Sequence, residues 1–385
     1  MKPKDQAGGE QSSFRVALLG TKFMGKAHSQ AYRNVNMYFS DAPHVEQVVI
    51  CGRSPGETEQ AREAFGWQEA STDWEAVVAR EDIDIIDIST PGHLHAEMAL
   101  AAAAAGKHVV CEKPLANTLD EARSMLAAVE AAGVRHLVMH NYRRVPAVAL
   151  AKRMVEDGRV GEIYHFRARY LQDWALIPGL ELVWRFDAKL AGSGALGDLG
   201  AHVIDLGRHL CGEMSELAAT SETFIKQRPV SPGSGEMADV TVDDAAALCV
   251  RFENGAIGTI EASRFAPGRK NHNTFEINGS GGSITFDLEN LNNLRYYSVD
   301  DTPDAQGFHE IIACSLGKHP YADNWWFDGH LLGYEHSFTH TLYDWLRAVD
   351  SGEPLRPDFA DGVRNQEVLD AAERAARSRR WEAVG

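Results

Sequence analysis

The sequence has little of what marks a membrane, secreted or nucleic-acid-binding protein. No apolar run approaches the roughly 20 residues that span a bilayer, and residues 1–13 lack the apolar core of a signal peptide. The five cysteines are scattered without a CxxC pair, so we expect reduced thiols, no metal site and a cytoplasmic location. The formal charge of −17 disfavours nucleic acid and anionic membranes as partners and suits a small neutral substrate.

A chain of 385 residues is long enough for two domains. We expect a flexible tail at 1–13, a dinucleotide-binding domain at 14–141 and a substrate-binding and oligomerisation domain at 142–385. In the first domain, short apolar runs alternate with helical segments, which predicts an α/β domain with a parallel, Rossmann-type sheet. Its strands are expected at 14–19, 44–52, 83–89, 108–111 and 135–140.

The second domain has a different pattern. Residues 163–172 alternate between apolar and polar side chains, and strands at 245–252 and 256–265 flank a Glu-Asn-Gly turn. Together with further strands at 274–279 and 282–288, this predicts an α+β domain with a large, mostly antiparallel open sheet. Because a sheet with an uncovered face usually finds a partner, we expect a homodimer or homotetramer.

The fingerprint of a dinucleotide-binding turn lacks its middle glycine. Gly20 and Gly25 hold the first and third positions of GxGxxG, after a strand and before a helix. Lys22 replaces the second glycine, and its side chain either points outward or adds a phosphate contact. Phe23 and Met24 complete the candidate cofactor turn, and a purely structural turn is the alternative.

The acid that usually ends the second strand of an NAD-binding domain is also missing. Gly52, Arg53 and Ser54 stand there instead. Without the carboxylate a 2′-phosphate is not repelled, and Arg53 with Ser54 can bind it, which favours NADP. The alternative is an NAD enzyme in which Arg53 stacks on the adenine. The cofactor prediction is therefore NAD or NADP, leaning to NADP.

The glycine-rich segment 191–210 carries the main catalytic candidates. Asp198 and His202 stand four residues apart, a spacing that places both on one face of a helix. A carboxylate beside an imidazole can orient it and stabilise its protonated form, as a general base requires. The alternative is a solvated aspartate and a core histidine.

Further candidates lie where ligands bind parallel sheets, at the carboxyl ends of strands. The i, i+2 pair of His93 and His95 has no acidic or thiol neighbour in sequence, so contact with the cofactor is favoured over metal binding. The candidate cofactor-binding residues at these strand ends are Thr90, Pro91, His93, His95, Glu112 and Lys113.

The candidate substrate-binding residues, besides Asp198 and His202, follow strands of either domain. Each of them has a structural role as its alternative. Among the tryptophans, Trp184, Trp325 and Trp326 are expected to be core or interface residues. A sugar-stacking role is favoured for Trp174. The substrate candidates are Tyr142, Arg143, Gln172, Trp174 and Arg264.

Taken together, these motifs resemble the glucose–fructose oxidoreductase, inositol dehydrogenase and rhizopine-catabolism (Gfo/Idh/MocA) family, from about Phe14 to Trp381. Glu112-Lys113-Pro114 matches the family's EKP, and residues 90–95 match TPNxxH with Gly92 in place of asparagine. The aspartate–histidine pair and the DFADG at 358–362 also fit. Segments such as YLQDW are most like the branch that oxidises levoglucosan, a 1,6-anhydrosugar, at its 3-hydroxyl with NAD.

The resemblance implies an NAD(P)-dependent dehydrogenase that oxidises a secondary hydroxyl of a sugar, anhydrosugar or cyclitol to the ketone. His202 would take the hydroxyl proton, Asp198 would orient His202, and Lys113 would donate to the reacting oxygen. The alternatives are an inositol or glucoside 3-dehydrogenase, an NAD-dependent glycoside hydrolase, or a non-catalytic sugar-sensing regulator on the same fold.

Overall fold

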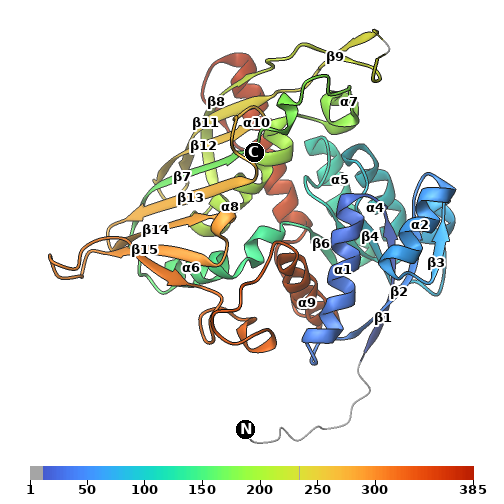
Figure 1. Ribbon diagram of the computed structural model, residues 1–385, viewed down its shortest axis with the longest axis horizontal. Coiled ribbons are helices and arrows are strands. Elements are labelled where there is room, and N and C mark those ends of the chain that lie inside the picture. Colours follow the sequence, from blue (N-terminus) through green and yellow to red (C-terminus); the bar gives the residue numbers. More distant parts are fainter. Residues whose placement is uncertain (1–11, 234) are drawn as a thin grey trace, which may run out of the picture.

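The first lobe of the computed structural model, which describes residues 12–233 and 235–385, is a six-stranded parallel sheet between helices (Figure 1). The strand order β3-β2-β1-β4-β5-β6 is that of the predicted Rossmann domain, with β4 buried at every residue. Its strands are β1 (Ser13–Leu19), β2 (His44–Cys51), β3 (Glu69–Ser71), β4 (Ile85–Ile88), β5 (His108–Cys111) and β6 (His136–Val138). Its helices are α1 (Phe23–Tyr38), α2 (Pro55–Phe65), α3 (Trp74–Val78), α4 (His95–Ala104) and α5 (Leu119–Ala132).

The tail predicted at residues 1–13 falls mostly outside the described residues. Ser13 is an exception, because β1 already begins there and pairs with β2. The strand β3 was missed by the sequence analysis, since its three residues carry no apolar pattern.

The second lobe is a nine-stranded sheet of order β16-β15-β14-β13-β7-β12-β11-β8-β17. Every neighbouring pair is antiparallel except β7 and β12, which run parallel. Its strands are β7 (Ile163–Leu171), β8 (Met214–Glu222), β11 (Ala245–Phe252), β12 (Ile257–Ser263), β13 (His272–Gly279), β14 (Gly282–Asp287), β15 (Asn293–Ser298), β16 (His309–Ile312) and β17 (Glu382–Ala383). A separate hairpin joins β9 (Gln227–Pro229) to β10 (Met237–Asp239).

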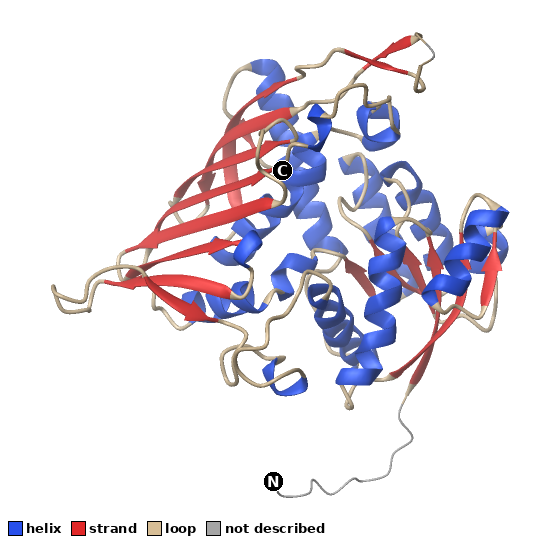
Figure 2. Ribbon diagram, viewed as in Figure 1, coloured by secondary structure: helices blue, strands red, loops and turns tan. Residues whose placement is uncertain are grey.

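Of the helices that the structure describes, all that pack on this sheet cover the face that looks toward the first lobe (Figure 2). The alternating burial of β11 follows from this arrangement, because every second side chain enters the core under the helices. The other face is open, and the hollow on it has a volume of about 1290 Å³. The helices of the second half are α6 (Pro146–Glu156), α7 (Ala188–Ala191), α8 (Ala201–Cys211), α9 (His336–Ser351) and α10 (Phe359–Ser378).

The last two long helices tie the lobes together. Phe338 and Leu342 of α9 belong to the same apolar cluster as Val16 of β1, and α9 lies beside α1 (Figure 1). The first turn of α10 packs into the core of the first lobe through Phe359, whereas Ala372 packs into the core of the second. The C-terminal segment therefore contributes to both cores. Within the described residues, no helix combines the length and the hydropathy needed to cross a membrane.

Candidate active site

The turn between β1 and α1 has the close packing that an approaching pyrophosphate requires. Gly20 has a φ of +130°, and a Cβ there would lie 2.4 Å from the Ser89 hydroxyl oxygen. A Cβ on Gly25 would lie 2.2 Å from the carbonyl oxygen of Gly20. The first N–H groups of α1 have no side-chain cap, so they fit an anionic group of a dinucleotide.

Lys22 replaces the middle glycine because this position needs no special backbone. Its φ of −91° and ψ of −150° are extended, a conformation open to any residue. The side chain points outward, and Nζ lies 2.9 Å from the carboxylate of Glu57 on α2. This contact lowers the pKa of Glu57. Next to it in sequence, Phe23 is 68% exposed at the mouth of the turn.

The carboxyl end of β2 packs too closely for the missing acid. A Cβ on Gly52 would lie 2.5 Å from the Thr58 hydroxyl oxygen and 2.6 Å from the Thr21 methyl carbon. Arg53 is exposed, and neither its guanidinium nor the Ser54 hydroxyl is bonded to any residue that the structure describes. Both groups are therefore available to a ligand at this strand end.

The loop after β4 contradicts one prediction. His95 was expected to touch the cofactor, but its buried ring lies between two carbonyl oxygens, 2.9 Å from that of Thr90 and 3.1 Å from that of Pro114. It therefore ties the β4 loop to the β5 loop. His93 instead contacts the carbonyl oxygen of Leu190, across the junction of the lobes, at 3.3 Å.

Within residues 12–233 and 235–385, neither histidine of that loop belongs to a group of three metal-ligating side chains. His272, Asp287 and Glu289 do form such a group, at the edge of the second sheet, with their ligand atoms within 4.8 Å of one another. The expectation that the enzyme needs no metal stays a prediction.

A buried charge network lies under the loop that carries Lys113. His28 of α1 is fully buried, with Nδ1 2.9 Å from the carboxylate of Asp87 and Nε2 3.0 Å from that of Glu112. The second oxygen of Glu112 accepts the N–H of Lys113 at 2.9 Å. Burial alone would lower the pKa of His28, but the charges and hydrogen bonds of Asp87 and Glu112 raise that pKa to about 10. The imidazolium thus neutralises carboxylates that could not be buried unpaired.

Lys113 and Asp198 meet where the two lobes join. Nζ of Lys113 donates to the main-chain carbonyl oxygen of Asp198 at 2.7 Å and lies 3.4 Å from its Oδ1. Arg264 donates to the other carboxylate oxygen at 3.0 Å. Burial would raise the pKa of Asp198, but the charges of Lys113, Arg264 and Arg185 hold that pKa well below its usual value. Asp198 is therefore an anion fixed between cations.

The segment around Asp198 is not a plain α-helix. A π turn spans Leu196–Gly200, and α8 begins only at Ala201. The carboxylate of Asp198 in this turn is held by Lys113 and Arg264. The expected hydrogen bond between Asp198 and His202 is absent from the described structure, and that part of the prediction was wrong.

Asp243 explains one of the glycines before this turn, Gly194. Its carboxylate accepts the N–H groups of Gly194 and Leu196 at 2.7 and 2.8 Å. A Cβ on Gly194 would lie 1.7 Å from the carbonyl oxygen of Asp243. Glycine is therefore required for the close approach that holds the start of the π turn.

His202 is a buried, neutral base candidate. Burial, with the charges of Lys113 and His140, holds its pKa well below the usual value. Its ring centroid lies 4.5 Å from that of Tyr142 and 5.6 Å from that of Tyr170. Among the residues that the structure describes, Nδ1 is enclosed without a partner, whereas Nε2 is neither hydrogen-bonded nor enclosed, and so it is the nitrogen open to a ligand.

Two predicted substrate contacts join a polar chain beside His202. The hydroxyls of Tyr142 and Tyr170 lie 2.9 Å apart, and that of Tyr170 donates to Oδ1 of Asn271 at 2.7 Å. Nε2 of Gln172 donates to the same oxygen at 3.0 Å. Sequence reasoning missed Asn271, because it stands in a connecting loop and carries no motif.

Two predicted arginine contacts have partners within the protein instead. Arg143 is buried with its guanidinium 2.6 and 2.9 Å from the carboxylate oxygens of Asp205, and it also lies 3.4 Å from Asp361. Arg264 is 1% exposed and holds Asp198. The structure therefore places both in ion pairs, the alternative role that the sequence left open.

The tryptophans divide in a similar way. Trp174 packs under the guanidinium of Arg264, with Cζ 5.2 Å from the ring centroid, and so reaches the Asp198 side of the junction. Trp325 donates to Nε2 of His340 at 2.6 Å and packs against Tyr38, so it is a partly buried residue at the edge of the core.

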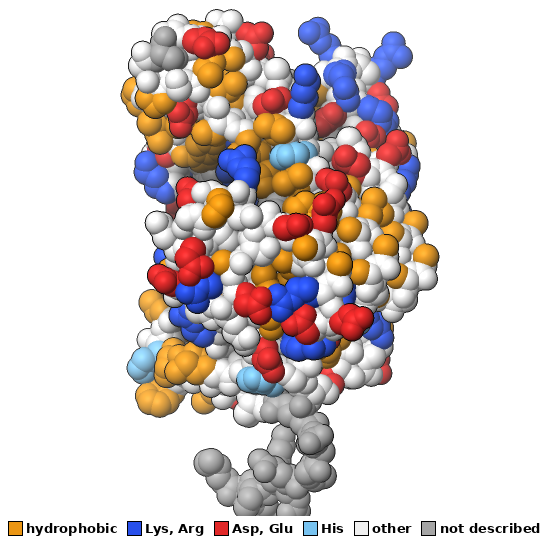
Figure 3. Space-filling view, turned by 90° about the vertical axis from the view of Figure 1, so that its right-hand side faces the viewer, with side chains coloured by type: hydrophobic (Ala, Val, Ile, Leu, Met, Phe, Trp, Pro, Cys, Tyr) orange, Lys and Arg blue, Asp and Glu red, His pale blue; other side chains and the backbone are white. Residues whose placement is uncertain are grey.

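On the face turned toward the viewer in Figure 3, acidic and basic side chains alternate over the middle and lower parts. These parts have no continuous basic stripe of the kind that tracks a nucleic-acid backbone.

Comparison with known proteins assigns both lobes. Residues 14–140 match the model of the oxidoreductase family with an NAD-binding Rossmann fold, and residues 148–285 match the GFO/IDH/MocA C-terminal domain. The chain belongs to the Gfo/Idh/MocA family. The predicted family and fold class are thereby confirmed, and the protein is an oxidoreductase.

Relatives within the Gfo/Idh/MocA family share the whole architecture. The levoglucosan dehydrogenase of Pseudarthrobacter phenanthrenivorans is 42% identical over 96% of this chain and 97% of its own. A solved levoglucosan dehydrogenase in complex with NADH has a TM-score of 0.94 at 42% identity, covering 97% of this chain and all of that one. An oxidoreductase domain protein from Kribbella flavida is 46% identical, with a TM-score of 0.93 and the same coverage.

Proposed function

We propose that this oxidoreductase oxidises a secondary hydroxyl of a neutral sugar to the ketone, with the 3-hydroxyl of a 1,6-anhydrosugar such as levoglucosan as the first candidate. The observation that carries the proposal is the meeting of Lys113 with Asp198 beside the neutral imidazole of His202. The relatives support it, since the solved levoglucosan dehydrogenases include one complex with NADH and levoglucosan.

The three side chains have distinct roles in this proposal. Nε2 of His202 accepts the proton of the reacting hydroxyl, and Nζ of Lys113 donates to the same oxygen as negative charge develops there. Asp198 supplies the negative charge that stabilises the imidazolium, since its charge raises the pKa of His202. It acts at a distance, without orienting the ring through a hydrogen bond.

The cofactor is a nicotinamide dinucleotide, held at the turn of Gly20 and Gly25 and the N-terminus of α1. When bound, it supplies the hydride acceptor for the sugar carbon. Arg53 and Ser54 favour NADP at the adenosine ribose, and pairing with Lys22 reduces the repulsion that Glu57 would exert on a 2′-phosphate. The NADH bound to the relative supports NAD, so both cofactors are proposed, with Arg53 setting their ratio.

A substrate panel tests the proposal. Levoglucosan, 1,5-anhydrosugars, glucosides and inositols are each offered with NAD and with NADP, and reduced cofactor and ketone are quantified together. A dehydrogenase produces both in equal amounts. A glycoside hydrolase would release the aglycone without net cofactor reduction, and a sugar-sensing regulator would bind sugar without either product. A preference for inositols or glucosides would identify the protein as a dehydrogenase of that substrate class instead of an anhydrosugar dehydrogenase.

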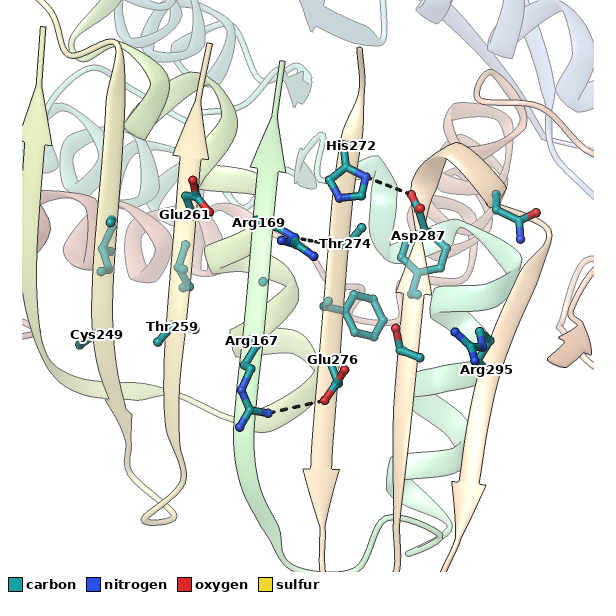
Figure 4. Close-up of a pocket in the computed structure, with 18 of the residues that line it drawn as sticks. Arg167, Arg169, Cys249, Thr259, Glu261, His272, Thr274, Glu276, Asp287 and Arg295 are labelled. Carbon is teal, nitrogen blue, oxygen red and sulfur yellow. Dashed lines mark hydrogen bonds and ion pairs between the residues drawn. The ribbon is translucent and has the colours of Figure 1, made fainter. Parts of the chain in front are cut away.

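We also propose that the protein is a homo-oligomer assembled through the open face of the nine-stranded sheet. Salt bridges such as Arg167–Glu276 neutralise charges within this face (Figure 4), which favours burial against a second copy. Light scattering of the purified protein, compared with that of Thr259→Arg in the middle of the face, tests it: a change to monomer in the variant is expected. The five free cysteines support the cytoplasmic location inferred from the sequence.

A further inference from the structure

The polar chain from Tyr142 to Gln172 has an order of hydrogen bonds that fixes which atoms remain free. Tyr170 has one hydroxyl proton, which it donates to Oδ1 of Asn271. Its bond with Tyr142 must therefore use the proton of Tyr142. Both phenols keep their protons at neutral pH, because burial raises the pKa of Tyr142 to about 12 and that of Tyr170 above its usual value.

Asn271 is held from several sides but not saturated. Its Oδ1 accepts from both Tyr170 and Gln172, and its main-chain N–H donates to the carboxylate of Glu289 at 2.9 Å. The side-chain nitrogen Nδ2 is different: it is not enclosed, and one of its two N–H groups donates to the hydroxyl oxygen of Tyr142. The protein thus fixes the direction of the second N–H group, which has no partner among the described residues.

The position of this amide relative to the base gives the second N–H group a target. Tyr170, whose hydroxyl touches Asn271, also packs against His202 at 5.6 Å between ring centroids. A sugar whose reacting hydroxyl faces Nε2 of His202 has further oxygens within reach of side chains one residue layer away. The free N–H group of Asn271 therefore lies beside the position of the reacting hydroxyl, and not at that position.

We propose that Asn271 is a specificity-determining residue, which donates through Nδ2 to an oxygen of the sugar other than the one oxidised. The inference rests on the proposed function and adds its recognition chemistry. A donor in this position selects a sugar with an ether or hydroxyl oxygen there and rejects one with hydrogen. Gln172 donates to Asn271 through Nε2, and its Oε1, which has no partner in the described part of the chain, would accept from a neighbouring hydroxyl of the sugar.

Asn271→Asp is the sharpest test. A carboxylate still accepts from Tyr170 and Gln172, so these hydrogen bonds persist, but both N–H groups of the amide are lost, including the one without a partner. We expect KM for the sugar to rise about ten- to a hundredfold, the cost of an unpaired polar group, while kcat changes little. KM for the cofactor should not change. Asn290→Asp makes the same change at an exposed position and should leave all three constants unaltered.

The oxygen that Asn271 recognises can be identified with deoxy analogues of the best substrate. The analogue that lacks this oxygen should lose about as much kcat/KM with the wild-type enzyme as the intact sugar loses with Asn271→Asp. When Asn271→Asp is assayed with this analogue, the loss in kcat/KM should be no larger than the loss caused by the variant or the analogue alone. If the losses multiply for every analogue, Asn271 does not contact a sugar oxygen and the inference is wrong.

Calorimetric binding of the sugar to the enzyme with reduced cofactor separates the two proposals. Weaker binding to Asn271→Asp than to wild type supports the inference even if no sugar is oxidised, a result that would overturn only the proposed reaction. Equal binding overturns the inference even if turnover is normal. Should Asn271→Asp fail to fold, Asn271→Ser removes the same donors without adding charge, and the same two outcomes apply.

Discussion

The Nζ atom of Lys113 lies 2.7 Å from the main-chain carbonyl oxygen of Asp198, so that a loop of the first lobe touches the π turn of the second. Its distance to the carboxylate Oδ1 of the same residue is longer, 3.4 Å. The ammonium is thus anchored mainly by backbone, and its remaining protons are free to approach a substrate oxygen.

Lys113→Met removes the cation and nearly preserves the shape. We expect kcat to fall by about a thousandfold or more, because the charge that develops on the sugar oxygen then lacks its donor. The fold and cofactor binding should persist. Turnover and the dissociation constant of the reduced cofactor measure the two effects, with the exposed Lys26→Met on α1 as control. Unchanged turnover in Lys113→Met would exclude its role.

The acid limit of activity should reflect His202. Burial and the charge of Lys113 hold the pKa of this imidazole below its usual value, so the base stays neutral as the pH falls through 6.5. We expect the acid limb of kcat/KM in the free enzyme to lie below pH 6.5. A limb above this pH would show that His202 is not the neutral base described. His202→Asn should lose turnover at every pH.

His28 should make stability depend on alkaline pH. Its pKa is raised from 6.5 to about 10, so its stabilising effect is complete below pH 6.5 and is lost as the pH rises through 10. His28→Gln leaves Asp87 and Glu112 without their cation and should lower the free energy of unfolding at pH 6 by about 3–5 kcal/mol.

Denaturant unfolding across this pH range measures the effect of His28→Gln. The difference between wild type and variant should shrink from pH 6 to pH 10. His44→Gln, at an exposed histidine that begins β2, serves as the control and should show no such trend. A difference that is constant with pH would contradict a charged His28.

Arg53→Ala should change the choice of cofactor. A guanidinium that bonds a 2′-phosphate contributes a charge-assisted hydrogen bond, so its loss should lower kcat/KM for NADP about ten- to a hundredfold relative to NAD. The ratio of the two constants is the measurement, and Arg377→Ala on α10 is the control. An unchanged ratio would mean that Arg53 does not read the phosphate.

Much of the fold could be predicted because it depends on local patterns. The alternation of strands and helices in the first half, and the period of two in β11 and β12, each report one buried face. The strands β8 and β15–β17 were not predicted from the sequence, because short or half-polar strands depend on neighbours that lie elsewhere in the chain. Their pairing is decided only when the sheet forms.

The candidate site also has a part that could be predicted from local sequence and a part that could not. The chemistry of Lys113, Asp198 and His202 could be read from residue types and motifs, and so could the glycine turn. That Asp198 faces two cations rather than His202 could not, because Lys113 and Arg264 come from segments 85 and 66 positions away in the sequence.

The amino-acid sequence alone determined two sheets, a dinucleotide turn and the residues able to move a proton, because periodicity and composition act over neighbouring residues. Only the tertiary structure decided which of these residues meet. Gln172 reaches Asn271 across 99 positions, and His28 reaches Glu112 across 84. Such contacts depend on strand order and on the close packing of loops at strand ends, and no local pattern encodes either.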